Sequence, residues 1–150
     1  MSDSLPSPEA VQEAICAEDL SVLRRSLENS PLALSLGIEF SEFHHGHAAA
    51  RLPAGRLLPN FLGYSHTGAL FALAEQVMAA AANSLGHVGL PLSCEIHFLK
   101  GADPEKELRA EARVVDTQGR IARVLVEVFQ GTLPIARLTE MVFLRSSARG

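Results

Sequence analysis

The sequence contains only 2 cysteines, no cluster of positive charge and no apolar run long enough to cross a bilayer. Cys16 and Cys94 lie far apart and lack the paired spacing of a disulfide framework or a zinc motif. The 13 lysines and arginines are scattered singly along a chain of net charge -4, which argues against nucleic-acid binding. The start, MSDSLPSPEA, has neither the basic residues nor the apolar segment of a secretion signal. These absences predict a protein of the reducing cytoplasm.

The sequence does contain enough apolar material for one domain. Hydrophobic residues make up 47% of the 150 residues, which suffices for a substantial core, and nothing indicates a second domain. The apolar run of residues 68–82 is too short to span a bilayer, and Glu75 interrupts it. We therefore expect no membrane-spanning helix and a single core organised around this run.

Residues 60–86, NFLGYSHTGALFALAEQVMAAAANSLG, form the most informative stretch of the chain. From residue 68 to 82 almost every residue is apolar and favours a helix, and the exceptions are Glu75 and Gln76. A helix that is apolar on nearly all sides must be enclosed by other structure. Burying a carboxylate without a partner costs roughly several kcal/mol. Glu75 is therefore a candidate functional residue.

The start of this helix is the second candidate region, because polar and small residues gather there. The first N–H groups of a helix lack internal acceptors and can bind the partial negative charge of an acyl carbonyl. Thr67 precedes Glu75 by eight positions, about 12 Å along a helix axis, so one carbonyl cannot meet both residues of the same helix. Antiparallel pairing with a second copy of the chain would bring Glu75 of one copy beside Thr67 of the other. The residues of this region are Asn60, Gly63, Ser65, His66, Thr67 and Gly68.

The remaining segments predict an α+β fold. Ser7 and Pro8 begin a helix that should end near Ser30, so residues 1–30 are predicted to be a tail with one peripheral helix and residues 31–150 the main domain. The central helix should stop at Gly86 and the following turn residues 89–91. Strand-like segments occupy residues 37–43, 46–52, 91–100, 107–115, 121–130 and 133–145. We predict a curved, mostly antiparallel sheet wrapped around the long apolar helix.

Two of these strands carry further information. In residues 107–115 apolar side chains alternate with charged ones, which predicts one face in water. Residues 124–129 are apolar on both faces, which predicts contact with a partner.

Three histidines, His44, His45 and His47, flank the turn between the first two strands. Imidazole is a common zinc ligand, so they suggest a metal site. Adjacent residues of a strand point to opposite faces, however, and no cysteine or third ligand with suitable spacing accompanies them. We favour an exposed turn and expect no metal.

The N-x-x-G-x-x-H-T-G motif of residues 60–68, followed by a small and apolar segment and an acid, resembles the hotdog-fold acyl-CoA thioesterases of the phenylacetate-pathway type. In that family a histidine follows an asparagine by six positions and an acid follows the histidine by nine, as Asn60, His66 and Glu75 do. Ser93 stands eighteen positions after the acid, where the family often has serine or threonine. The segment GALFALAE also resembles hotdog domains of unassigned function.

Two positions depart from the commoner family pattern. Thr67 replaces a glycine and Glu75 replaces an aspartate, although glutamate is the acid of the 4-hydroxybenzoyl-CoA thioesterases. The resemblance implies that the N–H groups of Thr67 and Gly68 bind the developing oxyanion, and that Glu75 acts as nucleophile or as general base. The sequence leaves open which of these two roles Glu75 has.

The resemblance also implies supporting roles. Asn60 would orient water or substrate, Ser93 would hold water near the acid, and His66 would hold the turn into the helix rather than act as acid or base. The resemblance further implies a homodimer with a continuous sheet and, in many members, a dimer of dimers. The coenzyme A phosphates could meet Lys100, Arg120 and Arg123, and the acyl group an apolar pocket near Leu57, Leu58 and Phe61.

The leading hypothesis is therefore a thioesterase that hydrolyses a fatty or aromatic acyl-CoA at a dimer interface, with coenzyme A thioester as substrate and no cofactor. One alternative is a hotdog module that binds acyl-CoA or another lipid without cleaving it. A third is a dehydratase of enoyl or hydroxyacyl thioesters, which would use His66 with Glu75. The acyl group, and the choice between coenzyme A and acyl carrier protein, are not written in the sequence.

Overall fold

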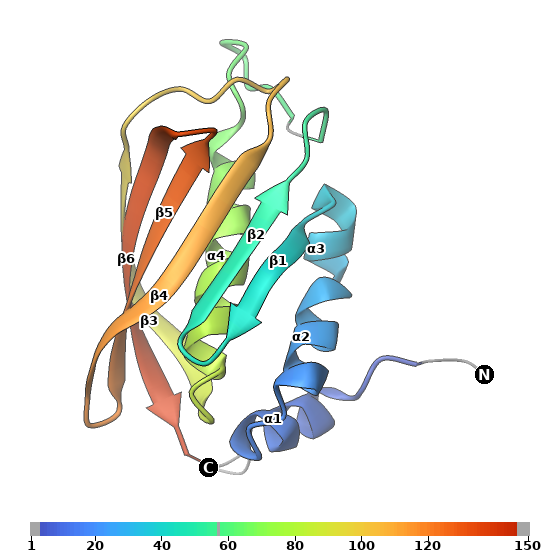
Figure 1. Ribbon diagram of the computed structural model, residues 1–150, viewed down its shortest axis with the longest axis vertical. Coiled ribbons are helices and arrows are strands. Elements are labelled where there is room, and N and C mark those ends of the chain that lie inside the picture. Colours follow the sequence, from blue (N-terminus) through green and yellow to red (C-terminus); the bar gives the residue numbers. More distant parts are fainter. Residues whose placement is uncertain (1–3, 57, 147–150) are drawn as a thin grey trace.

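The computed structural model describes residues 4–56 and 58–146. One antiparallel sheet and four helices make up this part of the chain (Figure 1). The chain runs through α1 (Pro8–Cys16), α2 (Leu20–Glu28), α3 (Pro31–Leu36), β1 (Glu39–His44), β2 (His47–Leu52), α4 (Thr67–Asn83), β3 (Val88–Phe98), β4 (Leu108–Gln118), β5 (Ile121–Gln130) and β6 (Leu133–Arg145).

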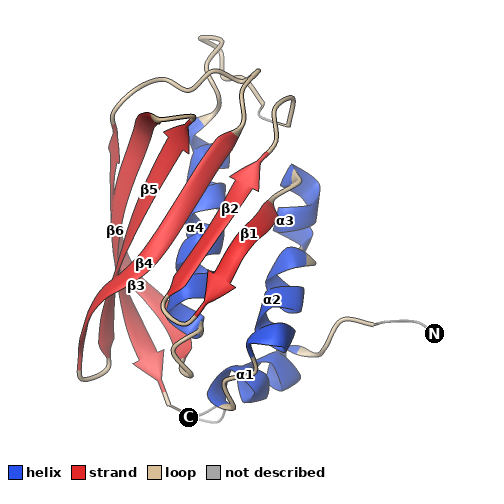
Figure 2. Cartoon of the chain, viewed as in Figure 1, coloured by secondary structure: helices blue, strands red, loops and turns tan. Residues whose placement is uncertain are grey.

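The sheet has six strands in the order β1-β2-β4-β5-β6-β3, and every neighbouring pair is antiparallel. The sheet curves around α4, and α1 to α3 lie on the side of β1 (Figures 1 and 2). The predicted α+β class, with a curved antiparallel sheet around one long helix, is confirmed. β1 and β3 are the two edge strands of the sheet.

Small side chains on the inner face of the sheet let α4 pack closely against it. Ala48 and Ala50 of β2 lie opposite Ala112 and Ala110 of β4, and all four are fully buried. Because these alanines leave space, large apolar side chains of α4 can fill the core at close packing. The buried large side chains of α4 are Leu70, Leu73, Val77 and Met78.

The outer face of the sheet carries charges, as the alternation in residues 107–115 predicted. Arg51 pairs with Glu39 at 2.6 Å and with Glu107 at 3.1 Å. Arg109 pairs with Glu111 at 3.2 Å. These side chains are exposed or half-buried, so they keep this face in contact with water rather than adding much stability.

The N-terminal segment differs from the prediction of one peripheral helix, because it forms two, α1 and α2, and a third helix that was not predicted, α3, follows them. Glu18 adopts a left-handed φ of 57°, which ends α1. The Asp19 carboxylate then accepts hydrogen bonds from two N–H groups at the start of α2. Ser30 and Pro31, read as a helix end, instead begin α3 as cap and first residue. A capping side chain offers the backbone an alternative to continuing a helix, which the apolar spacing did not reveal.

The short helices pack on the body through a small core of their own. Ile15 of α1, Leu23 of α2 and Val88 of β3 are buried together. The Ser30 hydroxyl donates to Gln76 Oε1 of α4 at 3.5 Å. The segment is therefore attached to both the sheet and the central helix. No helix in residues 4–56 and 58–146 combines the length and the apolarity needed to cross a membrane.

β3 begins earlier than predicted, since it includes the segment 89–91 that was read as a turn. Pro91 pairs with Val142 of β6, and the register shifts between Pro91 and Ser93. Proline is tolerated in a strand where it lies at the edge of a sheet or beside a bulge, and β3 satisfies both conditions.

Candidate active site

His66 forms the N-cap of α4. Its Nδ1 accepts a hydrogen bond from the Gly68 N–H at 2.9 Å, and its carbonyl accepts one from the Ala69 N–H at 3.0 Å. The Gly68 N–H is thus already engaged. The Thr67 N–H has no acceptor among the described residues, so Thr67 supplies the available donor at this helix start.

Asn60 organises the loop that leads into α4. Its Oδ1 accepts hydrogen bonds from the Leu62 N–H at 2.9 Å and the Tyr64 N–H at 3.2 Å. Its own N–H donates to the Tyr64 carbonyl at 2.7 Å. The side-chain oxygen is therefore used by the turn. The amide NH2 has no partner within the described chain.

A cavity of about 330 Å³ opens at the start of α4. It brings Asn60, Thr67 and Lys100 together beside apolar side chains. Gly101 lies close to Tyr64 there, and a Cβ at this position would lie 2.6 Å from Cδ1 of the tyrosine ring. The complete lining is Asn60, Tyr64, Ser65, Thr67, Leu70, Phe98, Leu99, Lys100, Gly101 and Ala102. We call this hollow the helix-start cavity.

Glu75 lies in a different, smaller cavity of about 50 Å³ between α4, β3 and β6. Its side chain is half-buried. Burial raises the pKa of the Glu75 carboxyl, and a hydrogen bond with the Gln76 side chain lowers it in part. Within one chain Glu75 and Thr67 therefore line separate cavities, as their spacing along the helix requires. We call the space beside Glu75 the carboxyl cavity.

Glu140 is a second acid in the carboxyl cavity, and the sequence analysis missed it. It lies on the inner face of β6 between Leu138 and Val142 and is 5% exposed. Burial and the charge of Glu75 raise the pKa of Glu140 to about 7. The sequence signal for its burial was the alternation of residues along 133–145, because every second position there is apolar and Glu140 falls in that series.

Ser93 does not join Glu75 within one chain. Ser93 lies opposite Met141 and Cys94 lies opposite Glu140 in the β3–β6 pair. Opposite residues share a face and successive residues alternate, so Ser93 lies on the outer face of the sheet. Glu75 lies on the inner side.

The three cations proposed for coenzyme A are spread over the molecule. The Lys100 N–H donates to the Ile135 carbonyl near the start of β6. Arg120 lies in the turn between β4 and β5, where its carbonyl accepts the Leu144 N–H near the end of β6 at 2.8 Å. One chain thus places Lys100 at the helix-start cavity and Arg120 at the other end of the sheet.

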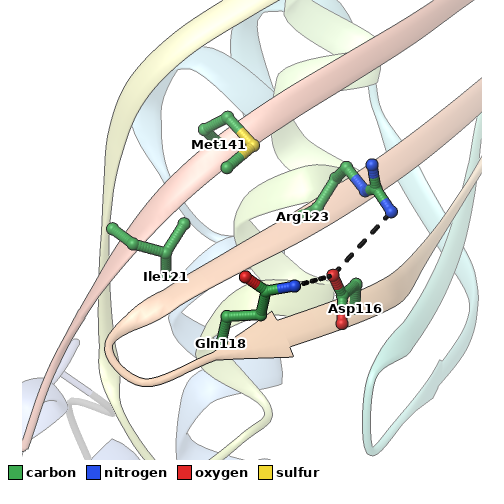
Figure 3. Close-up of a pocket in the computed structure, with 5 residues that line it drawn as sticks. All are labelled: Asp116, Gln118, Ile121, Arg123 and Met141. Carbon is green, nitrogen blue, oxygen red and sulfur yellow. Dashed lines mark hydrogen bonds and ion pairs between the residues drawn. The ribbon is translucent and has the colours of Figure 1, made fainter.

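Arg123 borders a hollow of about 340 Å³ on the outer face. Its guanidinium pairs with Asp116 at 3.8 Å, and Gln118 Nε2 donates to the same carboxylate at 3.3 Å (Figure 3). Ile121 and Met141 complete the lining. Arg123 therefore has an acidic partner and lies apart from both Glu75 and Lys100.

The acyl pocket expected near residues 57–61 is not enclosed in one chain. Leu58 is 69% exposed and Phe61 is 94% exposed. Leu57 lies outside the described residues.

The turn histidines are closer together than strand alternation suggested. His44 and His47 are cross-strand partners, with stacked rings 4.5 Å apart. Alternation separates neighbours along one strand, whereas these two residues lie opposite each other across the hairpin. Glu42 adds a third group, and the ligand atoms of Glu42, His44 and His47 lie within 4.8 Å of one another. His47 Nε2 is also held by Glu111 at 2.9 Å.

Comparisons with known proteins agree with this architecture. Residues 62–135 match the family model of the thioesterase superfamily. A protein of Archaeoglobus fulgidus named "Putative esterase" is 30% identical over 101 residues, which cover 67% of this chain and 66% of that protein. Acyl-coenzyme A thioesterase PaaI of Escherichia coli K12 is 32% identical over 87 residues, which cover 58% of this chain and 62% of the relative.

A solved structure gives the same result for the fold. Conserved protein PA5202 of Pseudomonas aeruginosa is 29% identical, with a TM-score of 0.72 over 80% of this chain and 98% of that one. The sheet wrapped around α4 is a hotdog fold, and residues 62–135 form a domain of the thioesterase superfamily. Within that superfamily it is similar to acyl-CoA thioesterases of the PaaI type, over slightly less than two thirds of the length of the two curated relatives.

Proposed function

We propose that this protein is an acyl-CoA thioesterase whose active site is completed by a second copy of the chain. The observation that carries the proposal is Glu75, a half-buried carboxyl in a largely apolar helix, which opens onto a cavity beside the edge strand β3. Burial of a carboxylate is unfavourable, so its presence in this helix indicates a functional role. The PaaI relative is named as an acyl-coenzyme A thioesterase, which supports the reaction class.

The edge strand β3 supports a homodimer. Its outward side has no neighbouring strand in the described chain, and it exposes large apolar side chains, with Leu92 60% and Phe98 50% exposed. Proteins usually cover such an edge, and a second β3 can do so by extending the sheet. A two-fold axis there would run the two α4 helices antiparallel and place Glu75 of one copy near Thr67 of the other.

The reaction follows from these two groups. The Thr67 N–H would donate to the thioester carbonyl as negative charge develops on its oxygen. Glu75 would take a proton from water while the water oxygen bonds to the acyl carbon, or would attack that carbon itself to form an anhydride that water then opens. The carbon–sulfur bond breaks, and the released thiolate takes up a proton. The products are a carboxylic acid and coenzyme A.

The helix-start cavity would hold the thioester arm. Its lining combines apolar Leu70, Phe98 and Leu99 with the cation Lys100 and the free amide of Asn60. Few polar groups in an apolar cleft are typical of small-molecule sites. Arg120 and Arg123 can contribute to coenzyme A binding at this cavity only from a second copy. Fatty and aromatic acyl groups both fit this description.

The test is release of coenzyme A thiol from a panel of straight-chain and aromatic acyl-CoAs. We expect turnover by the wild type and a loss of about 100-fold or more in Glu75→Gln, since general base or nucleophilic catalysis of this kind contributes at least that factor. Glu105→Gln, in the exposed loop before β4, is the control for loss of an acid. The proposal fails if the wild type hydrolyses no substrate or if Glu75→Gln retains full activity.

One observation favours a second function, the binding of acyl-CoA without hydrolysis. The Gly68 N–H donates to His66 at 2.9 Å, which leaves one free donor at the helix start instead of two. A weaker oxyanion site would retain affinity and lose rate. Calorimetry that shows tight acyl-CoA binding, together with no thiol release, would support this alternative. The same hydrogen bond uses His66 Nδ1 as a cap, which argues against a dehydratase that needs His66 for proton transfer.

A further inference from the structure

Glu140 faces Glu75 across the carboxyl cavity. It is 5% exposed, and its carboxyl makes no hydrogen bond or ion pair with any described residue. A buried acid without a cation or donor is rare, because the ionised form loses its hydration and gains nothing in return. The neutral form of Glu140 is therefore favoured.

Among the described residues that line this cavity, none carries a positive charge. From α4 the cavity receives Glu75 with Met78, Ala79, Ala82 and Asn83, and from β3 it receives Gly89 and Pro91. Cys94 of β3 and Val124 of β5 are its cross-strand partners. The Asn83 amide is used by the backbone, since it donates to the Ala79 carbonyl and accepts the Gly89 N–H, both at 2.9 Å. The titratable groups that face Glu140 are thus Glu75 and Cys94.

Two ionised carboxylates that line the same cavity would repel each other, so the pair favours a state that retains one proton. The more buried member should hold it. Glu140 is more buried than Glu75, and Glu75 has the Gln76 side chain as a hydrogen-bond partner. The charge of Glu75 and burial both favour the neutral form of Glu140. The cavity that both acids line, of about 50 Å³, has room for a water.

We propose that Glu140 is a positioning residue for Glu75: it holds the proton that the pair shares and, through a water in the cavity, donates a hydrogen bond that orients the ionised Glu75 carboxylate. This inference rests on the proposed role of Glu75 as the reacting group. It assigns the two acids different tasks, one ionised and one neutral, set by their different burial. When Glu140 ionises, the donor is lost and the two carboxylates repel, so turnover should fall as pH rises through 7.

The first test does not depend on enzyme activity. The folded-state pKa of Glu140 lies near 7, above the ordinary 4.5, so its contribution to stability is present below pH 4.5 and is lost as pH rises through 7. Thermal unfolding of the wild type between pH 4.5 and 8.5 should show this loss. Glu140→Gln, which stays neutral, should lack it. Glu75→Gln should show a smaller loss of stability over this pH range, because the negative charge of Glu75, which favours protonation of Glu140, is absent.

The second test is the pH profile of coenzyme A release. We expect the wild-type rate to fall above pH 7, Glu140→Gln to keep most of the rate without this fall, and Glu140→Ala to be slow at every pH, because it lacks a donor. A purely structural role would lower the rate without changing the profile. Glu105→Gln is the control for an acid-to-amide change in an exposed loop.

Each outcome separates this inference from the proposed function. An alkaline fall that persists unchanged in Glu140→Gln, or stability curves that have the same pH dependence in this variant and the wild type, would overturn the positioning role. The stability changes of Glu75→Gln and Glu140→Gln could be non-additive while the wild type hydrolyses no acyl-CoA. That result would support a proton shared by the two acids and reject the proposed thioesterase activity.

Discussion

At the scale of single residues, Thr67 and Gly68 differ in what their backbones can do. The Gly68 N–H is held by His66, whereas the Thr67 N–H points from the first position of α4 without an acceptor in the described chain. A substitution that removes one N–H and leaves the helix intact can therefore test the oxyanion role directly.

Thr67→Pro is that substitution. Proline fits the first position of a helix and removes its N–H, and His66 has a φ of -63° and a ψ of 129°, which suit a residue before proline. We expect kcat to fall by roughly 100- to 1,000-fold, the usual cost of losing one oxyanion donor, with little change in the midpoint of thermal unfolding. Thr67→Ala keeps the N–H and should retain most activity. Equal kinetics of the two variants would exclude the Thr67 N–H from the reaction.

Gly101 shapes the helix-start cavity through its lack of a side chain. A Cβ there would lie 2.6 Å from Cδ1 of Tyr64, so Gly101→Ala must displace the tyrosine ring. Tyr64 is 52% exposed and can move into solvent, so we expect less than about 1 kcal/mol of destabilisation. The KM for acyl-CoA should rise severalfold as the cavity wall moves. In the double variant with Tyr64→Ala, the changes in KM caused by the two substitutions should not be additive. Full additivity would show that the contact between the new Cβ and the tyrosine ring does not cause the change in KM.

At the scale of elements, β3 determines how the molecule can associate. Its apolar, unpaired outer side contrasts with β1, which is flanked by α2 and by charged side chains. Only one edge of the sheet is thus suited to pairing with another chain.

Leu92→Lys tests this edge. Leu92 is 60% exposed, and a lysine there places a charge where two β3 strands would meet, so we expect a shift from dimer to monomer in sedimentation experiments with a parallel loss of activity. Leu34→Lys, on α3 and also 60% exposed, is the matched control. A dimer that survives Leu92→Lys but not Leu34→Lys would place the interface on the N-terminal helices instead.

Because the N-terminal helices pack on the body of the domain, we expect them to stabilise it. Leu23 is 3% exposed in the small core that joins α1, α2 and β3. Leu23→Ala should lower the free energy of unfolding by about 2 to 5 kcal/mol, as for other buried leucines. Leu34→Ala, at an exposed position, should change it by less than about 0.5 kcal/mol. Urea denaturation measures both values, and equal values would mean that the helices unfold separately from the body.

At the scale of the whole molecule, the candidate site is divided. One chain places Thr67 and Asn60 in the helix-start cavity and Glu75 in the carboxyl cavity, and the thioesterase hypothesis needs both groups on one carbonyl. A site shared between two copies resolves this separation.

Complementation between two inactive variants tests whether each active site combines Glu75 of one subunit with Thr67 of the other. Glu75→Gln and Thr67→Pro should each be nearly inactive alone. Co-expressed in equal amounts, half of the dimers carry both variants, and each such dimer has one intact site, so about one quarter of wild-type activity should return. The measurement is thiol release by the purified co-expressed protein. The control is a mixture of the two separately purified variants under conditions in which subunits do not exchange. No recovery on co-expression would place Glu75 and Thr67 in the same subunit's site.

Local patterns predicted the secondary structure well where one rule applied. The apolar run of α4 and the alternation in β4 were read correctly, because burial on all sides or on one face leaves a period in the sequence. α1 and α2 were read as one helix and α3 was missed, because Asp19 and Ser30 act as caps that start new helices along a continuous apolar stripe. His44 and His47 were separated by reasoning along one strand, whereas the hairpin register pairs them.

The sequence by itself determined the fold class and the unusual acid of α4, because periodicity and burial of a charge are local properties of the chain. Only the tertiary structure decided what that acid faces. Glu140 is distant from Glu75 in the sequence and reaches it because β6 lies beside β3, and the order of strands in a sheet depends on long-range pairing that no local period records. The same holds for Ser93, whose face of the sheet is set by its register with Met141 rather than by its distance from Glu75 along the chain.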